Sequence, residues 1–320
     1  MNSKYAEYLP LIENISKHNP ELRSDEIAAS VVKKHPTISA SGLARFIRRS
    51  GVAKPQNEQQ KAHAKVLIFD IETAPLRAFI WSKWQKGVND GQIISDWFII
   101  CWSAKWLFED EIYNACITSK EIAIGNDERV VRSLWRMMDE ADIVIAHNGK
   151  KFDRKKANTR FLAHDLKLPS PYELIDTLLH ARKQFGITSN RLDYIAQDFF
   201  GIEGKKENSR GLWERCMNGD SEALHEMQVY CNQDIRVLED VYLKLRPYIQ
   251  PHPNIGLHVA STIQCCSTCG SDDLTFGGTY RTYVNEYESF RCNSCGALGR
   301  VRKSATPKQV KDRLTVSLPR

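Results

Sequence analysis

Four acidic side chains stand along this chain where carboxylates could act together on a metal ion. Asp70 and Glu72 close an apolar run, Asp153 follows a second apolar run, and Asp234 comes four residues after Tyr230. Two carboxylates two residues apart in a strand point to the same face, where they repel each other unless a cation neutralises them. Hard carboxylate oxygens suit Mg²⁺ or Mn²⁺. The pattern therefore predicts a divalent-metal centre.

The sequence around these acids resembles the three motifs of the DEDD 3′–5′ exonucleases, the DnaQ-like branch of the ribonuclease H superfamily. The motifs read V66-L-I-F-D-I-E-T73, I143-V-I-A-H-N-G-K-K-F-D153 and Y230-C-N-Q-D234. In the other subclass a histidine lies five residues before the last acid, and that position is Val229 here. The resemblance favours the tyrosine subclass. It covers about residues 65–248, and this region resembles exonuclease-like proteins of bacteria and tailed phages.

The resemblance implies a role for each motif residue in a two-metal hydrolysis of phosphodiester bonds. Asp70 would bridge the two Mg²⁺ or Mn²⁺ ions, Glu72 and Asp234 would hold the first ion, and Asp153 would support the second. The Tyr230 hydroxyl would orient the attacking water, because a phenol is a poor base near neutral pH. The expected activity is removal of nucleoside monophosphates from a 3′ end, with single-stranded DNA as the expected substrate.

Each motif alone has an ordinary explanation, such as a surface acid pair or a helix cap. Tyr194 and Asp198 repeat the last motif, but the family order places the third motif in a later helix, so we interpret this pair as a solvated helix face. His147 and Asn148 resemble family positions near the substrate sugar, and a buried, hydrogen-bonded pair is an equal alternative. Asp176 is interpreted as a helix cap.

Two alternative functions stay open at this point. The same fold could cut RNA, or cut structured junctions endonucleolytically, because discrimination at the 2′-hydroxyl depends on pocket shape. The chain could instead be a nucleic-acid-binding regulator in which the nuclease fold is only a scaffold. Proofreading would require a polymerase as a partner, since we identify no polymerase motif in this sequence.

Two Cys-x-x-Cys-Gly motifs near the C-terminus predict a structural zinc site. Four thiolates in a tetrahedral array are the ligands that structural Zn²⁺ prefers, and small ribbons of this kind require the metal to fold. Cys265 offers a less suitable spacing and is interpreted as a spare thiol. The aromatic segment between the motifs predicts a β-hairpin, and together they predict a zinc ribbon. The expected ligands are Cys266, Cys269, Cys292 and Cys295.

Both ends of the chain carry basic side chains that could contact nucleic acid. Residues 1–52 predict short helices, 27–34 and 43–49, arranged like a helix-turn-helix, with Ser24 and either Ser39 or Ser41 as caps. A structural or partner-docking role is the alternative for this module and for the ribbon. The tail from Ser304 is expected to be loose. The basic contacts proposed are Arg45, Arg48 and Arg49 in the first module, and Arg281 and Arg302 in the ribbon, with Asn148 beside the second acidic motif.

Charge and composition agree with a nucleic-acid enzyme outside membranes. Residues 1–62 and 251–320 each have a net charge of +4, whereas residues 63–250 have a net charge of −2. A slightly acidic centre with basic flanks suits cation binding in the middle and attraction to a polyanion at the ends. No apolar run approaches the roughly 20 residues of a membrane span, and no signal peptide pattern is found, so a cytoplasmic protein without disulfides is expected.

The order of predicted elements gives the fold class, an α/β ribonuclease H-like mixed sheet with flanking helices. Apolar runs predict strands at 65–70, 97–106, 111–117 and 143–146, and periodic patterns predict later helices, the longest at 221–238. No glycine-rich nucleotide-binding motif is found. The expected parts are a helical module (1–52), a linker (53–62), the exonuclease domain (63–250), the ribbon (258–303) and a basic tail (304–320).

Overall fold

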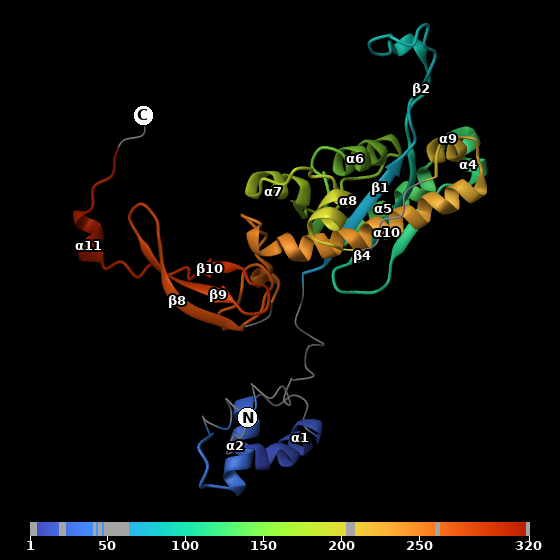
Figure 1. Cartoon of the computed structure of the whole chain (residues 1–320). Coiled ribbons are helices and arrows are strands. Elements are labelled where there is room, and N and C mark those ends of the chain that lie inside the picture. Colours follow the sequence, from blue (N-terminus) through green and yellow to red (C-terminus); the bar gives the residue numbers. More distant parts are fainter. Residues whose placement is uncertain are drawn as a thin grey trace. The chain divides into compact units, whose positions relative to one another are not determined.

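The computed structural model of the chain (Figure 1) describes residues 5–18, 24–40, 43, 47, 64–202, 209–259 and 263–317. The chain divides into two compact units, Met1–Ala62 and His63–Arg320, and each is described by itself. The predicted linker, residues 53–62, lies outside the described residues, and so do Arg45, Arg48 and Arg49. The DNA contacts assigned to these arginines stay a prediction.

The first unit is mostly helical where it is described, with a turn over residues 35–39. It contains η1 (Ala6–Tyr8), α1 (Leu9–His18) and α2 (Ser24–Lys34). The predicted helix at 27–34 is confirmed and begins at the expected Ser24. Of the predicted helix at 43–49, only Leu43 and Ile47 are described. Both are fully buried in the apolar core of this unit, with Ile12, Ile27 and Val31.

A five-stranded mixed sheet forms the centre of the second unit, in the order β5-β4-β1-β6-β7. β1 pairs antiparallel with β4 and parallel with β6, so it is the central strand. Its residues Val66–Phe69 are buried, as an apolar run between two helical layers requires. The strands are β1 (Val66–Thr73), β4 (Ile99–Trp106), β5 (Tyr113–Cys116), β6 (Ile143–Ala146) and β7 (Glu173–Asp176).

Helices cover both faces of this sheet, and alternate residues of β1 decide which helix they meet. Leu67 and Phe69 belong to the core on the face of α5 (Glu128–Asp139) and α6 (Asp153–Ala163). Ile68 faces α7 (Thr177–Gln184) and the C-terminal half of the 25-residue α10 (Ser221–Leu245). The arrangement confirms the ribonuclease H-like α/β fold.

Most predicted elements of the second unit are confirmed, with shifted ends. The long helix continues past its predicted end to Leu245. Residues 190–198, where the periodic pattern predicts one helix, form two elements, α8 (Leu192–Tyr194) and the π-helical η4 (Ile195–Phe199). The short strand β7 and the short helix α9 (Leu212–Met217) were not predicted. Unlike the wholly apolar β6, β7 has only two apolar residues, and the six residues of α9 make fewer than two helical turns, which explains both omissions.

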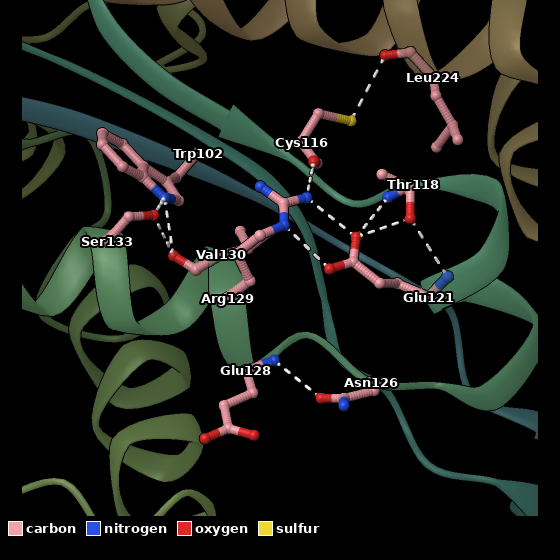
Figure 2. Close-up of polar contacts among 10 residues, drawn as sticks. All are labelled: Trp102, Cys116, Thr118, Glu121, Asn126, Glu128, Arg129, Val130, Ser133 and Leu224. Atoms are coloured by element: carbon pink, nitrogen blue, oxygen red, sulfur yellow. Dashed lines mark hydrogen bonds and ion pairs between the residues drawn. The ribbon is translucent and has the colours of Figure 1, made fainter.

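A hydrogen-bonded corner joins β5, α4 (Ser119–Ile124) and α5 (Figure 2). The Arg129 guanidinium donates to the Cys116 carbonyl at 2.7 Å and to both carboxylate oxygens of Glu121 at 2.9 Å. The hydrogen bond from Arg129 lowers the pKa of Glu121 to about 2. Glu121 also accepts from Thr118, the N-cap of α4, in a capping box. This corner fixes the edge strand against α5.

A long insertion separates β1 from β4 and extends from the end of β1, in cyan in Figure 1. It contains β2 (Arg77–Ala78), η3 (Asp90–Gln92) and β3 (Ile93–Ser95), with β2 and β3 antiparallel. The Ala74 N–H donates to the Phe98 carbonyl at 2.8 Å and closes the base of the insertion. The sequence analysis did not predict this hairpin.

The C-terminal part is a small three-stranded sheet followed by a short helix. Its strands are β8 (Leu274–Arg281), β9 (Glu286–Cys292) and β10 (Leu298–Arg300), in the order β10-β9-β8. The predicted hairpin is confirmed. The expectation of a loose tail is wrong for residues 308–313, which form α11 (Lys308–Arg313), because Pro307 lies immediately before a run without helix breakers.

Within the described ranges, none of the helices combines the length and the apolar character needed to cross a lipid bilayer.

Candidate active site and cysteine cluster

Three of the four predicted acids meet at the end of the central strand. Asp70 and Glu72 lie near the carboxyl end of β1. Asp234 lies on α10, which crosses the face of the sheet to which these two side chains point. Each offers a carboxylate oxygen, and these oxygens lie within 4.8 Å of one another. Oxygens at this separation can share one divalent cation, so the group could hold a metal ion.

Asp153 approaches the three acids from the other helical layer. It is the first residue of α6 and only 2% exposed, and it does not belong to the group within 4.8 Å. Burial raises the pKa of Asp153 to about 7, although backbone N–H groups, including that of Ile71, favour its charged form. An acid held beside the backbone of β1, but apart from the other three, is suited to supporting a second ion.

Asp70 lies where the negative charges converge. Its pKa is raised well above the usual range, first by burial and then by the neighbouring Cys231, Asp153 and Glu72. The Cys231 thiol donates a long hydrogen bond of 3.7 Å to the Asp70 carboxylate. Without a cation the site would hold protons instead, because crowded buried carboxylates cannot all be ionised. The site therefore has the electrostatic character of a cation-binding centre.

Polar contacts with β4 fix the rotation of α10 and so the direction of its functional side chains. The Ser103 hydroxyl donates to Asn232 at 2.7 Å and accepts from Gln228 at 2.9 Å. About two helical turns after Asn232, Glu239 pairs with the buried Lys105. Ser103 is the partner of Asp70 across the β1–β4 ladder, so this seam places α10 directly over Asp70.

Tyr230 lies one helical turn before Asp234, as the motif requires. The two side chains therefore share a face of α10. Tyr230 is partly buried and packs against the core cluster that contains Cys231 and Phe69. The other Tyr-x-x-x-Asp pair does not reach the acids, because Asp198 is exposed on η4. This agrees with its interpretation as a solvated face.

The loop between β6 and α6, which ends at Asp153, is held by a buried acid on β7. The Asp176 carboxylate accepts from the backbone N–H groups of Asn148 at 3.1 Å and of Lys150 at 2.9 Å. It also caps α7 by accepting from Leu179 at 3.2 Å, so its predicted role as a cap is confirmed. Sequence reasoning missed the loop contact, since it joins residues 26 and 28 positions apart.

His147 and Asn148 occupy this loop in different ways. Both ring nitrogens of His147 are engaged, lying 2.9 Å from the Thr177 hydroxyl and 2.9 Å from the Asn190 carbonyl. This arrangement matches the hydrogen-bonded alternative for His147. Asn148 has φ of +72°, a left-handed conformation that asparagine tolerates better than most residues. Its side chain is partly exposed, and substrate contact stays a prediction.

The four predicted cysteines form a compact cluster in the C-terminal sheet. The Cys266 and Cys295 sulfurs are 3.7 Å apart, and the Cys269 and Cys292 sulfurs are 3.6 Å apart. A tetrahedron with Zn–S bonds of about 2.3 Å has sulfurs about 3.8 Å apart. The observed edges fit that geometry and are too long for disulfides. Cys265 is not part of the cluster.

Within the cluster Cys266 favours the thiolate, whereas hydrogen bonding to Cys266 raises the pKa of Cys269 and of Cys295. Hydrogen bonds from the Cys269 and Cys295 thiols, and from the Thr268 and Cys269 backbone, hold the pKa of Cys266 far below its usual range. The Thr268 N–H donates to the Cys266 sulfur at 3.4 Å. Amides turned towards sulfur are typical of zinc knuckles, so the group could hold a metal ion.

The two predicted arginine contacts of the ribbon have different surroundings. Arg281 is exposed but donates to Glu286 at 2.7 Å. The neighbouring negative charge weakens the attraction of this arginine for a phosphate. Arg302 is exposed on the segment after β10. The neighbouring Arg300 lies over the Tyr287 ring at 3.8 Å. Nucleic-acid binding by the ribbon stays a prediction.

A comparison with protein-family models agrees with the fold. A family model described as RNase_H superfamily matches residues 111–246, which is less than half of the chain. The matched range includes Asp153 and Asp234 but not Asp70 and Glu72. Among solved structures, the chain is similar to the family B DNA polymerase from the hyperthermophilic archaeon Pyrobaculum calidifontis, with 17% identity and a TM-score of 0.43. That similarity covers 57% of this chain and 25% of the polymerase chain. No curated protein matches. The superfamily match supports a nuclease in general terms.

Proposed function

We propose that the chain is a metal-dependent 3′–5′ exonuclease of the tyrosine DEDD type, acting on single-stranded DNA. The observation that carries the proposal is the meeting of Asp70, Glu72 and Asp234 within 4.8 Å, with buried Asp153 beside them. A bacterial or phage origin and cooperation with a polymerase are compatible with this activity and stay predictions.

In the proposed reaction each acid has a separate position. Asp70, at the centre of the repelling charges, would contact both ions, Glu72 and Asp234 would complete the first site, and Asp153 would support the second. Divalent ions bound there would activate water and neutralise charge developing on the phosphate oxygens. The Tyr230 hydroxyl, one turn from Asp234, would hold the attacking water in line.

The test uses 5′-labelled single-stranded DNA and RNA of equal sequence, with Mg²⁺, Mn²⁺ or EDTA. Asp70→Asn and Asp234→Asn are expected to lower the rate at least about a thousandfold, because each removes a metal ligand. Asp198→Asn is the matched control, since it alters an exposed acid in a copy of the same motif. A ladder that shortens from the 3′ end, and stops with EDTA, supports the proposal.

Other outcomes would replace the proposal by a specific alternative. Faster cleavage of the RNA strand would change the substrate and keep the chemistry. Cleavage of circular or 3′-blocked strands would indicate an endonuclease. Binding without metal-dependent cleavage of either strand would indicate a regulator that uses the nuclease fold as a scaffold.

A further inference from the structure

The insertion between β1 and β4 exposes an unusual set of apolar side chains. Trp81 and Trp84 are 85% and 82% exposed. Contiguous exposed apolar groups on a folded chain mark interaction surfaces. In residues 76–95 every large apolar side chain is more than a third exposed, namely Leu76, Phe79, Ile80, Trp81, Trp84, Val88, Ile93 and Ile94.

Polar side chains, rather than an apolar core, hold this hairpin together. The Gln92 amide donates to the Phe79 carbonyl at 2.9 Å, and its oxygen accepts from the Asn89 N–H at 3.0 Å. The Gln85 amide donates to the Gly87 carbonyl at 2.8 Å, and its oxygen accepts from the Trp81 N–H at 3.3 Å. The two indoles are therefore presented from a defined turn, which lowers the entropy lost on binding.

Both ends of the hairpin are anchored beside the acids. Its first strand begins five residues after Glu72, the last acid of β1, and the Ala74–Phe98 hydrogen bond closes its base. On the returning side, the Trp97 ring lies 3.5 Å from the ammonium of Lys156, one turn after Asp153 on α6. A ligand bound to the acids would therefore leave the site close to the base of the hairpin.

The charges of the hairpin favour a polyanion as the occupant. Arg77, Lys83 and Lys86 outnumber the acids of residues 76–96, Asp90 and Asp96. The Lys83 ammonium lies 5.5 Å from the centre of the Trp84 ring, so a cation accompanies an exposed stacking face. Aromatic faces interleaved with cations are typical of surfaces that bind single-stranded nucleic acid.

We propose that this hairpin binds the single strand upstream of its 3′ end, with Trp81 and Trp84 stacking on bases and Lys83 and Lys86 contacting phosphates. The inference rests on the proposed nuclease function and names the device that holds its substrate. Trp81 comes nine residues after Glu72, so its Cα atom lies at most about 30 Å from the Cα atom of Glu72. At about 3.4 Å per stacked nucleotide, the contact falls within about nine nucleotides of the 3′ end.

Binding is measured separately from cleavage, so that the two proposals can fail independently. The full chain carries Asp70→Asn, and anisotropy of labelled 20-nucleotide DNA and RNA strands is recorded in EDTA. Trp81→Ala/Trp84→Ala is expected to weaken binding roughly 10- to 100-fold, and Trp81→Phe/Trp84→Phe to retain most of the affinity. Lys83→Gln/Lys86→Gln should reduce the slope of log affinity against log salt by about 1.4.

The matched control is Leu162→Ala/Leu168→Ala, which removes two apolar side chains, each 78% exposed, outside the hairpin. It should bind like the parent protein. Parent affinity should also rise with strand length to about nine nucleotides, whereas the double alanine variant should gain less. Unchanged affinity of the double alanine variant would overturn the inference and make the hairpin a surface for a protein partner. Weakened binding by the double alanine variant, together with a parent protein with intact Asp70 that cleaves neither strand in Mg²⁺ or Mn²⁺, would retain the hairpin and reject the exonuclease.

Discussion

The acidic site and the cysteine cluster could each hold a cation, and they are built in different ways. The cysteine cluster is closed, since four sulfurs from two short loops of one small sheet fill a tetrahedron. The acidic site is assembled from β1, α6 and α10, and three of its acids bring carboxylate oxygens within 4.8 Å of one another, fewer ligands than a Mg²⁺ ion takes. A metal in the cysteine cluster would therefore stabilise the fold, whereas metals in the acidic site would be able to exchange and to react.

Loss of a zinc thiolate should give the largest effect, and only in the ribbon. Cys292→Ser is expected to release the ion and unfold residues 263–317, because zinc binding supplies about 10–16 kcal/mol in small zinc domains. Metal content and amide NMR dispersion would measure this. Cys265→Ser is the control and should keep one zinc per chain, since Cys265 lies outside the cluster. Full zinc content in Cys292→Ser would contradict the closed-site model.

The cysteine cluster is expected to stabilise the fold, whereas the metal-free acidic site is expected to destabilise it as its acids ionise. The pKa of Asp153 is raised to about 7, so the folded state holds a proton that the unfolded state has lost above about pH 4. That contribution to stability is present at low pH and is lost as pH rises through 7. Between pH 5 and 8 the free energy of unfolding should fall by roughly 3 kcal/mol.

Urea unfolding in EDTA at pH 5 and pH 8 would test this second prediction. Asp153→Asn should show a smaller fall, because the amide does not titrate, and Mg²⁺ should restore stability to the parent protein at pH 8. The idea fails if the parent and Asp153→Asn lose equal stability. Proposed exonuclease activity should rise with pH through about 7, since ionised acids are needed to hold the cations.

A smaller effect is expected from the acid that positions the loop before Asp153. Asp176→Ala removes the acceptor of three backbone N–H groups and should destabilise the chain by about 2 kcal/mol. It should also lower the exonuclease rate more than tenfold without altering zinc content. Asp139→Ala is the matched control, because Asp139 accepts a backbone N–H at the surface, from Ser170. Equal rates in the two variants would exclude a positioning role.

The smallest expected effect concerns the water held by Tyr230. Tyr230→Phe keeps the ring in its packing cluster and removes only the hydroxyl, so stability should stay within about 0.5 kcal/mol. The turnover rate should fall roughly 10- to 30-fold with little change in KM, because the hydroxyl would act on the reacting water. Tyr194→Phe is the control. A rise in KM alone would assign Tyr230 to strand binding instead.

The two sites also differ in how far the sequence could predict them. The cysteine cluster depends on spacing within two five-residue motifs, so local reading sufficed to select its members. The acids are far apart, and resemblance to a family, not spacing, grouped them. Which oxygens approach within 4.8 Å depends on the polar seam between α10 and β4, where Ser103 meets Asn232. Such tertiary contacts have no period in the sequence.

The elements of the fold also differ in how far the sequence could predict them. The central strands β1 and β6 were predicted because buried apolar runs of branched residues are distinctive. The hairpin was missed because its apolar residues do not pack, so they follow neither the period of two nor that of 3.6. The pair Trp81 and Trp84, close together with lysines and without a core period, was the signal available.

The hydrogen bond between Ala74 and Phe98 makes the hairpin separable from the rest of the sheet. It ties the two ends of the hairpin together, and they continue directly into β1 and β4, which are already paired as neighbours. The segment is thus a cassette, because a two-residue turn could join the same strands without changing the register of the sheet. Lineages could lengthen, shorten or exchange it while the acids keep their places. The proposed strand-binding hairpin could then change in length and sequence independently of the acidic residues.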